Sequence, residues 1–241
     1  MEQSTKGIVL HAIKYGETST IVHIYTQDYG LRGLMVKGVR SSKRNKSFTM
    51  GMFQPLTQLE IVMTTTKRGG LALLKSAKII YPYTTIPTSM TKSSLCMFLA
   101  ETLRAVLQEE EENQVLYTFL SHALLWLDAH QQTANFHLIL LIRLTKYLGF
   151  YPDTTNQDGI YFDLQNGQFC TSAQHIDCIS EVETSLLKRY LGMNFDEGVQ
   201  ILATAQQRRA LINVLIRYYQ THVQGFKTPK SLAVLYEIFN Q

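Results

Sequence analysis

The sequence predicts an α+β protein with a small five-stranded barrel at its N-terminus. An all-α helical region follows, and it contains a small irregular insert. Three observations support this prediction. Apolar residues alternate with a period of about two over the first 80 residues, they recur at spacings of three and four after residue 81, and a polar, turn-rich stretch occupies about residues 150–180. We therefore expect two domains, residues 1–80 and 81–241.

The first 80 residues contain five apolar, β-branched segments that are typical of strands. Short turn-like segments separate most of them, but a long connection joins the third segment to the fourth. Five strands of this length fit a Greek-key barrel of the OB type, although a piece of a β-sandwich would give a similar pattern. The predicted strands are residues 7–15, 19–25, 31–36, 58–66 and 71–80.

The remaining residues show the periodicity of amphipathic helices. Gly149 and Pro152 end the third helical segment. The insert that follows has turn signals at residues 158–159 and 166–167, on either side of a short strand-like segment at 160–164. The predicted helices are residues 89–108, 114–130, 133–148, 181–191, about 204–220, and 231–239.

The composition is that of a folded globular protein. Of the 241 residues, 45% are apolar and 17% are charged, which excludes a disordered or fibrous chain. Three cysteines cannot form a disulfide framework in a chain of this size, and the N-terminus lacks the apolar segment of an export signal. The apolar stretch FHLILLIRL at residues 136–144 is too short to span a bilayer. We expect a soluble, cytoplasmic protein without a membrane partner.

The charge is distributed unevenly along the chain. Residues 1–80 contain 12 basic and four acidic residues, a net charge of +8, whereas residues 81–241 contain 11 basic and 15 acidic residues, a net charge of −4. The formal net charge of +4 conceals this difference. The asymmetry predicts that the N-terminal part meets a polyanion and that the remainder does not.

The connection between the third and fourth predicted strands is strongly basic and contains no acid. Its sequence is KGVRSSKRNKSF, residues 37–48. Lysine and arginine neutralise phosphates and release counterions, which gives affinity for nucleic acid without sequence preference. A solvated basic linker is the alternative, but the charge of the whole first third favours nucleic-acid binding. The candidate DNA-binding residues are Lys37, Arg40, Lys43, Arg44, Lys46 and, on the third strand, Arg32.

Aromatic residues of the first third are candidates for stacking against bases. OB barrels commonly bind single strands across one sheet face, where aromatic rings provide stacking platforms. Tyr25, Tyr29, Phe48 and Phe53 are available for this role. A position in the barrel core is the more common role for each of them.

The sequence contains no constellation typical of an enzyme. It lacks GxxxxGK[ST], GxGxxG and GxSxG motifs. His11 and His23 lie in separate predicted strands, where a packed histidine is more common than a catalytic base. We therefore predict a protein without a catalytic site.

The insert contains three potential zinc ligands, Cys170, His175 and Cys178, with Asp163 and Asp177 near them in sequence. A structural zinc site normally has four Cys or His ligands, usually in close pairs. Neither a CxxC pair nor a second histidine is present. We therefore predict no bound metal and no cofactor.

The order and spacing of these segments resemble the RecO family of bacterial recombination mediators. The resemblance covers most of the chain and rests on four stretches. They are GIVLHAIKYGETSTIVHIYTQDYG at residues 7–30, LMVKGVRSSK at 34–43, FQPLTQLEI at 53–61, and KYLGFYPD at 146–153. It implies an N-terminal OB barrel, a helical domain and, in many members, a four-cysteine zinc module.

The resemblance also implies a function in the RecF pathway of recombinational DNA repair, at the bacterial nucleoid. Such proteins bind single- and double-stranded DNA and anneal complementary strands. With RecR, they load RecA onto DNA covered by single-strand-binding protein, whose acidic C-terminal tail they contact through the helical domain. Lys37, Arg40 and Lys43 match the family's KGxRxxK-like stretch, whereas Arg44 and Lys46 rest on charge alone.

The insert departs from the family pattern. Residues 156–159, where the family has its first cysteine pair, contain no cysteine. Cys170 remains at the second position, and Cys178 lies off the pattern. The resemblance therefore implies a member that has kept the loop and lost the metal.

Two other function classes fit the same residues. The basic barrel could bind an acidic protein, as in an interaction adaptor, or it could bind RNA as a translation or processing factor. For the acidic, aromatic tail of single-strand-binding protein, the helical region needs an apolar groove with a positive rim. The candidates for this rim are Arg143, Lys146, Arg208 and Arg209.

Overall fold

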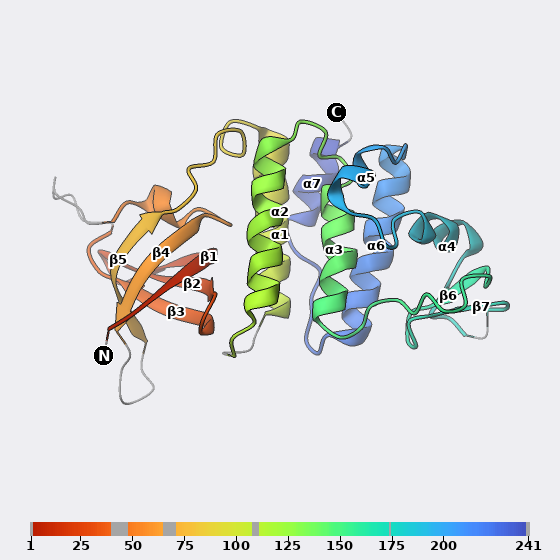
Figure 1. Cartoon of the computed structure of the whole chain (residues 1–241), viewed down its shortest axis with the longest axis horizontal. Coiled ribbons are helices and arrows are strands. Elements are labelled where there is room, and N and C mark those ends of the chain that lie inside the picture. The colour runs from red at the N-terminus through yellow and green to blue at the C-terminus, as the bar shows by residue number, and fades with distance from the viewer. Residues whose placement is uncertain (1, 40–47, 65–70, 108–110, 174, 240–241) are drawn as a thin grey trace. The chain divides into compact units, whose positions relative to one another are not determined.

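The structure is a computed structural model that describes residues 2–39, 48–64, 71–107, 111–173 and 175–239 (Figure 1). The chain divides into two compact units. The first comprises residues 1–128 and 229–231, and the second comprises residues 129–228 and 232–241. The first unit extends well past residue 80, where the sequence predicts a domain boundary. Because compactness alone does not define a domain that folds independently, that boundary stays a prediction.

The first unit contains a closed barrel in the strand order β1-β2-β3-β5-β4. β1 pairs with both β2 and β4, which closes the sheet, and β3 runs parallel to β5. Closure satisfies the backbone groups that an open sheet leaves at its edges. This order confirms the predicted OB-type barrel. The strands are β1 (Glu2–Tyr15), β2 (Ser19–Thr26), β3 (Gly30–Val36), β4 (Gln58–Thr64) and β5 (Ala72–Ile79).

Alternating apolar positions on the strands fill the barrel interior. This is the period-2 pattern of a strand with one buried face. Two residues of the long connection, Val39 and Phe48, join this core. The 3-10 helix η1 (Met50–Phe53) contributes Phe53. The buried core residues are Val9, Val22, Ile24, Leu34, Val36, Val39, Phe48, Phe53, Leu59, Ile61, Met63 and Leu74.

Two helices complete the first unit, α1 (Met90–Val106) and α2 (Gln114–Ala129). Ser89 caps α1, because its hydroxyl oxygen accepts a hydrogen bond from the backbone N–H of Lys92 at 3.3 Å. The carboxylate of Asp128 accepts the backbone N–H groups of Thr84, Thr85 and Ile86 at 2.9, 2.8 and 2.8 Å. Asp128 therefore holds the segment that leads from the barrel into α1.

The second unit is helical, with one small sheet. Nine of the 12 residues of α3 are buried, which explains why its sequence is apolar on almost every face. Among the described residues, no helix is both long and apolar enough to cross a membrane. The helices of this unit are α3 (Phe136–Tyr147), α4 (Glu181–Lys188), α5 (Phe195–Val199), α6 (Ala205–His222) and α7 (Leu232–Phe239).

The small sheet lies in the predicted insert and has the order β7-β6-β8. Its strands are β6 (Tyr161–Asp163), β7 (Gln168–Cys170) and β8 (Cys178–Ile179). Only the first of them was expected, because strands of two or three residues are too short to show a period. The sequence also did not predict the short helices η1 and α5. The predicted connection between the fourth and fifth strands, residues 67–70, lies outside the described residues.

Candidate nucleic-acid interface

The basic connection begins and ends at side chains buried in the barrel. Val39 is 2% exposed and Phe48 is 8% exposed, and the Phe48 ring contacts the Phe53 ring at a centroid distance of 6.2 Å. Lys37 is exposed directly after β3. Arg40, Lys43, Arg44 and Lys46 lie outside the described residues. Both ends of the charged segment are therefore anchored to the barrel core.

Strand register places a second lysine, Lys14, at the same end of the barrel as Lys37, two strands away. Lys14 pairs with Thr20 on β2, and Thr20 pairs with Val36, the residue that precedes Lys37. Both lysines are exposed, and Tyr15, next to Lys14, is 49% exposed. We call Lys14, Tyr15 and Lys37 the basic end of the barrel. Sequence reasoning missed Lys14 and Tyr15, although pairing of the first three strands could have located them.

Arg32 lies apart from the basic end. Arg32 is on β3, five residues before Lys37, and this separation corresponds to about 17 Å along a strand. It also has the strand parity of Leu34 and Val36, which point into the barrel, whereas Lys37 has the opposite parity. Arg32 is half-buried and pairs with Ile24 on β2. The structure therefore does not bring Arg32 and Lys37 together on one surface.

Three of the four candidate stacking residues are buried. Tyr25 is 3% exposed, and burial raises its pKa to about 12. Phe48 and Phe53 belong to the barrel core, and Tyr29 is half-buried against it. The barrel-core role expected for Phe48 and Phe53 is confirmed. Tyr25 is buried elsewhere, with its ring centroid 6.5 Å from that of Tyr117 on α2. Tyr15 is the more accessible ring, at the end where the basic connection starts.

The two strand histidines are packed against each other. His11 lies directly opposite His23, and their rings stack at a centroid distance of 6.3 Å. Burial lowers the pKa of both imidazoles, and the charge of Arg104 on α1 lowers the pKa values further. Both imidazoles are therefore neutral at pH 7, and neither adds positive charge for binding a polyanion.

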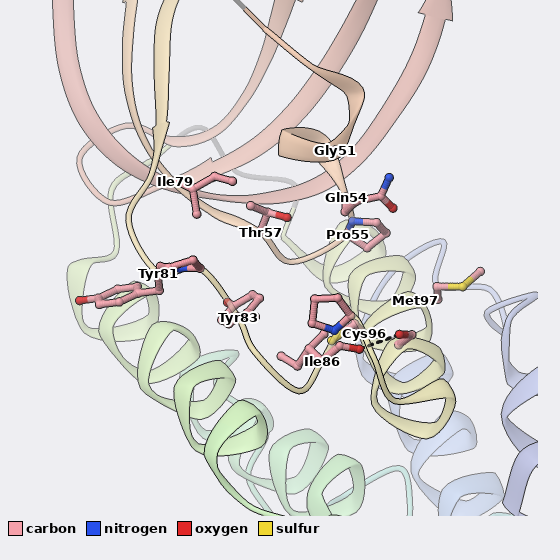
Figure 2. Close-up of a pocket in the computed structure, with 13 residues that line it drawn as sticks. Gly51, Gln54, Pro55, Thr57, Ile79, Tyr81, Tyr83, Ile86, Cys96 and Met97 are labelled. Atoms are coloured by element: carbon pink, nitrogen blue, oxygen red, sulfur yellow. Dashed lines mark hydrogen bonds between the residues drawn. The ribbon is translucent and has the colours of Figure 1, made fainter.

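A pocket of about 510 Å³ lies in the first unit, below the barrel strands in Figure 2. The hydroxyl of Tyr83 in its wall donates to the Leu56 carbonyl at 3.0 Å and accepts from Gln58 Nε2 at 3.0 Å. None of the described residues that line the pocket is charged, so the pocket does not suit a phosphate. It is lined by Gly51, Gln54, Pro55, Thr57, Ile79, Tyr81, Pro82, Tyr83, Ile86, Pro87, Ser93, Cys96 and Met97.

The four candidate rim residues of the helical region do not form one group. Arg208 and Arg209 are adjacent on α6, with their guanidinium groups 5.8 Å from the Phe239 ring and 4.2 Å from the Tyr236 ring. Arg143 instead lies 5.6 Å from the Phe195 ring, and Lys146 is exposed near the end of α3. The arginine pair borders a small hollow that is lined by His137, Ala205, Arg208, Arg209, Ile212, Leu235, Tyr236 and Phe239.

Two of the three potential zinc ligands of the insert, His175 and Cys178, lie close to Asp163, whereas Cys170 is outside this group. One ligand atom each from Asp163, His175 and Cys178 falls within 4.8 Å of the others. The side chains of Cys178 and Cys170 are hydrogen-bonded. Asp177 has a different role, because its carboxylate accepts a hydrogen bond from Gln165 Nε2 at 2.5 Å.

Comparison with known proteins shows similarity over the full chain. The family models for the N-terminal and C-terminal parts of recombination protein O match residues 1–83 and 87–232. The DNA repair protein RecO of Flavobacterium johnsoniae is 43% identical over 240 residues, and that of Flavobacterium psychrophilum is 42% identical over 240 residues. In both comparisons, 100% of each chain is covered. The DNA repair protein RecO of Bacteroides fragilis is 37% identical over 245 residues, with 100% of each chain covered.

Proposed function

The chain belongs to the RecO family of DNA repair proteins, and we propose that it binds single-stranded DNA through the basic end of its barrel and anneals complementary strands. With RecR, it helps to load RecA onto DNA covered by single-strand-binding protein, and it acts without a catalytic site. The observation that carries the proposal is the closed OB-type barrel, whose basic connection starts at the end of the barrel where Lys14 and Lys37 are exposed.

The composition of this surface favours contacts to phosphates. Lys14 and Lys37 are exposed at the point where the basic connection starts, and the connection adds four positive charges between Val39 and Phe48. Phosphate contacts hold a strand without reading its sequence. Such contacts account for binding to single strands of arbitrary sequence. They also allow binding to duplexes, which carry the same phosphates.

The buried aromatics favour annealing over tight capture of bases. A protein that stacks successive bases on aromatic platforms sequesters the faces that must stack in a new duplex. Here Tyr25, Phe48 and Phe53 are buried. A strand held mainly through its phosphates leaves its bases available for pairing, which is the requirement for annealing.

The helical unit is the proposed contact for the tail of single-strand-binding protein. Arg208 and Arg209 supply two positive charges beside the apolar and aromatic side chains of the α6–α7 hollow. An acidic tail that carries an aromatic residue is complementary to such a surface in charge and in polarity. Because the hollow itself holds only about 10 Å³, binding there requires Tyr236 or Phe239 to move.

The salt dependence of DNA binding tests the interface. We compare the wild-type protein with a Lys14→Ala/Lys37→Ala variant, using a fluorescent single strand of arbitrary sequence. Loss of two phosphate contacts should reduce the slope of log affinity against log salt by about 1.4. A Lys227→Ala/Lys230→Ala variant, which removes the same charge from exposed residues far along the chain, should keep the wild-type slope.

Three outcomes separate the function classes. Equal slopes for both double variants and the wild type contradict the proposed interface. The absence of oligonucleotide binding near physiological salt favours the adaptor, and clearly tighter binding to an RNA strand than to a DNA strand of the same sequence favours the RNA-binding factor. Annealing of complementary strands, followed by fluorescence with and without single-strand-binding protein, should be slower in the Lys14→Ala/Lys37→Ala variant than in the Lys227→Ala/Lys230→Ala control.

A further inference from the structure

The pocket of about 510 Å³ in the first unit has large apolar side chains that remain exposed. Its volume is in the range of pockets that take small organic molecules. Ile79 is the last residue of β5, Tyr81 follows it, and Met97 comes from α1 (Figure 2). These three side chains are 36%, 38% and 50% exposed, respectively. Exposed apolar groups gathered around a hollow are typical of a binding surface.

The wall of this pocket is uncharged. Burial raises the pKa of the Cys96 thiol to about 12 and also raises the pKa of the Tyr83 hydroxyl, so both groups are neutral at pH 7. The Tyr83 hydroxyl both donates and accepts a hydrogen bond within the protein, and the Ser93 hydroxyl donates to the Ile86 carbonyl oxygen at 2.8 Å. Because these hydroxyls are paired and no described residue of the lining is charged, the pocket suits an uncharged ligand with apolar faces.

Gln54 supplies hydrogen-bonding capacity for such a ligand. It is an exposed residue of the same lining. Its side-chain amide has both a donor and an acceptor. The edge of a nucleobase presents donors and acceptors side by side, and glutamine side chains commonly pair with such edges. An uncharged, flat ring with a polar edge therefore fits both the walls of the pocket and this side chain.

The pocket adjoins the basic end of the barrel. Thr20, which pairs with Lys14 and with Val36, has its Oγ1 3.9 Å from Met50 Sδ. Gly51, the next residue of η1, lines the pocket. With one residue η1 therefore contacts the strands of the basic end, and with the next it borders the pocket.

The basic connection leads into the same wall. It ends at Phe48, three residues before Gly51, and three residues span at most about 11 Å of chain. Lys37, where the connection begins, directly follows the strand residue that pairs with Thr20. A strand of DNA held by its phosphates at the basic end therefore passes a neutral, apolar pocket.

We propose that this pocket binds one unstacked nucleobase of the single strand held at the basic end, with the base packed against Tyr81 and Met97. This site depends on the proposed function, because the lysines of the basic end hold the phosphates of the strand. A base is uncharged and has two π faces, so stacking against an aromatic side chain is favourable for any base. Because one pocket takes one base, the neighbouring bases stay available for pairing.

Strands with and without bases test the pocket. Oligo-dT and an abasic strand of the same length carry the same phosphates, so only contacts to bases distinguish them. We expect the wild type to bind oligo-dT about 5- to 150-fold more tightly, the range of affinity that stacking of one base contributes. The Tyr81→Ala/Met97→Ala variant should bind the two strands with nearly equal affinity. Its slope of log affinity against log salt should stay that of the wild type, because no charge is removed.

A matched variant shows whether any loss is specific to the pocket. Met90→Ala/Val115→Ala removes two apolar side chains of the same unit that are 71% and 70% exposed and do not line the pocket. This variant should keep the wild-type preference for oligo-dT. Circular dichroism confirms that each variant is folded.

Photocrosslinking gives a readout that does not depend on a variant. A single strand with one 5-iodouracil is irradiated with the wild-type protein, and the crosslinked tryptic peptides are identified by mass spectrometry. We expect a crosslink in the peptide of residues 79–92, which contains Tyr81 and Tyr83. Crosslinks confined to other peptides would contradict the proposed pocket.

The outcomes separate the pocket from the DNA interface. The pocket is wrong if the wild type binds both strands equally, or if Tyr81→Ala/Met97→Ala keeps the wild-type preference for oligo-dT. The second result points to an apolar protein segment as the occupant. In either case a reduced salt slope in Lys14→Ala/Lys37→Ala still supports the interface. An unchanged slope in that variant contradicts the interface instead, and a wild type that binds neither strand contradicts both proposals.

Discussion

The barrel and the small sheet of the insert both contain antiparallel strand pairs, but they are stabilised differently. The strands of the barrel have between 7 and 14 residues and close into a ring around an apolar core. Those of the insert have two or three residues, and the sheet has two open edges. The insert relies on neighbours: Tyr218 of α6 packs on Phe162 with ring centroids 5.6 Å apart, and His222 Nε2 lies 2.8 Å from the Leu164 carbonyl oxygen.

The two regions differ in whether their polar side chains are needed for stability. A closed barrel satisfies its own backbone and buries its own side chains, so its surface residues are available for charge. A three-stranded sheet of this size cannot bury enough apolar area alone. Polar side chains such as Asp163 therefore help to stabilise the small sheet through hydrogen bonds. As a result, several polar side chains lie close together in the insert.

The largest expected effect is in the barrel core. Leu34 is fully buried, so Leu34→Ala should lower the free energy of unfolding by about 2–5 kcal/mol. Trp126 of α2 lies in the same compact unit, so its fluorescence in a urea titration reports this loss. Leu71→Ala, at a position 42% exposed, is the control and should cost much less. Similar losses for the two variants would show that barrel closure does not depend on this core.

Two turn glycines give a direct comparison of the barrel and the insert. Gly16 and Gly167 have similar backbone angles, with φ of +61° and +65°. A Cβ at Gly16 meets nothing within 4 Å, whereas a Cβ at Gly167 would lie 2.6 Å from Tyr218 Oη. Gly16→Ala should therefore cost about 1–2 kcal/mol from the left-handed backbone alone.

Gly167→Ala should lower the free energy of unfolding by about 1 kcal/mol more than Gly16→Ala does. The reason is that Tyr218 must move and lose its hydrogen bond to the Phe150 carbonyl oxygen, which is 2.7 Å long. Urea titrations followed by circular dichroism measure both variants. If Gly167→Ala is no more destabilising than Gly16→Ala, the contact between the insert and α6 is not rigid.

The helical unit should be sensitive to mild acid through His137. Burial and the charge of Arg208 lower the pKa of His137 from 6.5 to about 3. Between these values the unfolded chain binds a proton that the folded chain does not, so the free energy of unfolding falls as pH falls. This residue alone should contribute a slope of about 1.4 kcal/mol per pH unit.

Urea titrations at several pH values between 6.5 and 4.5 give the free energy of unfolding at each pH, and its change with pH is the slope. His137→Gln should flatten this dependence, whatever its effect on the absolute stability. His122→Gln, at an exposed position on α2, should keep the wild-type dependence. An unchanged slope in His137→Gln would mean that the buried imidazole is not the group that titrates.

The smallest expected effect concerns the charged outer face of the barrel. Glu60 on β4 pairs with Lys6 on β1 and with Lys78 on β5, and all three are exposed. Because exposed cross-strand pairs contribute little, Glu60→Gln should lower the free energy of unfolding by less than about 1 kcal/mol, and less still at high salt. A larger loss in a urea titration would show that these charges help to close the barrel.

Much of the secondary structure could be predicted, because long elements show their period in the sequence. In the part of the chain that the structure describes, all five barrel strands and six of the seven α-helices were expected close to their observed positions. The strands β7 and β8 and the helix α5 were not, because two to five residues cannot display a period. The basic connection was visible as a run of charge, but Lys14 and Tyr15 join it only through the pairing of β1, β2 and β3.

The sequence by itself determined the order of the long strands and helices, the positive charge of the first 80 residues and the resemblance to the RecO family, because these depend on composition and local spacing. The tertiary structure alone decided which side chains meet. It buried the candidate stacking rings Tyr25, Phe48 and Phe53, separated Arg32 from Lys37, and placed Asp163 beside Cys178. Those outcomes depend on strand pairing between residues far apart in the chain, and local periodicity carries no information about such pairing.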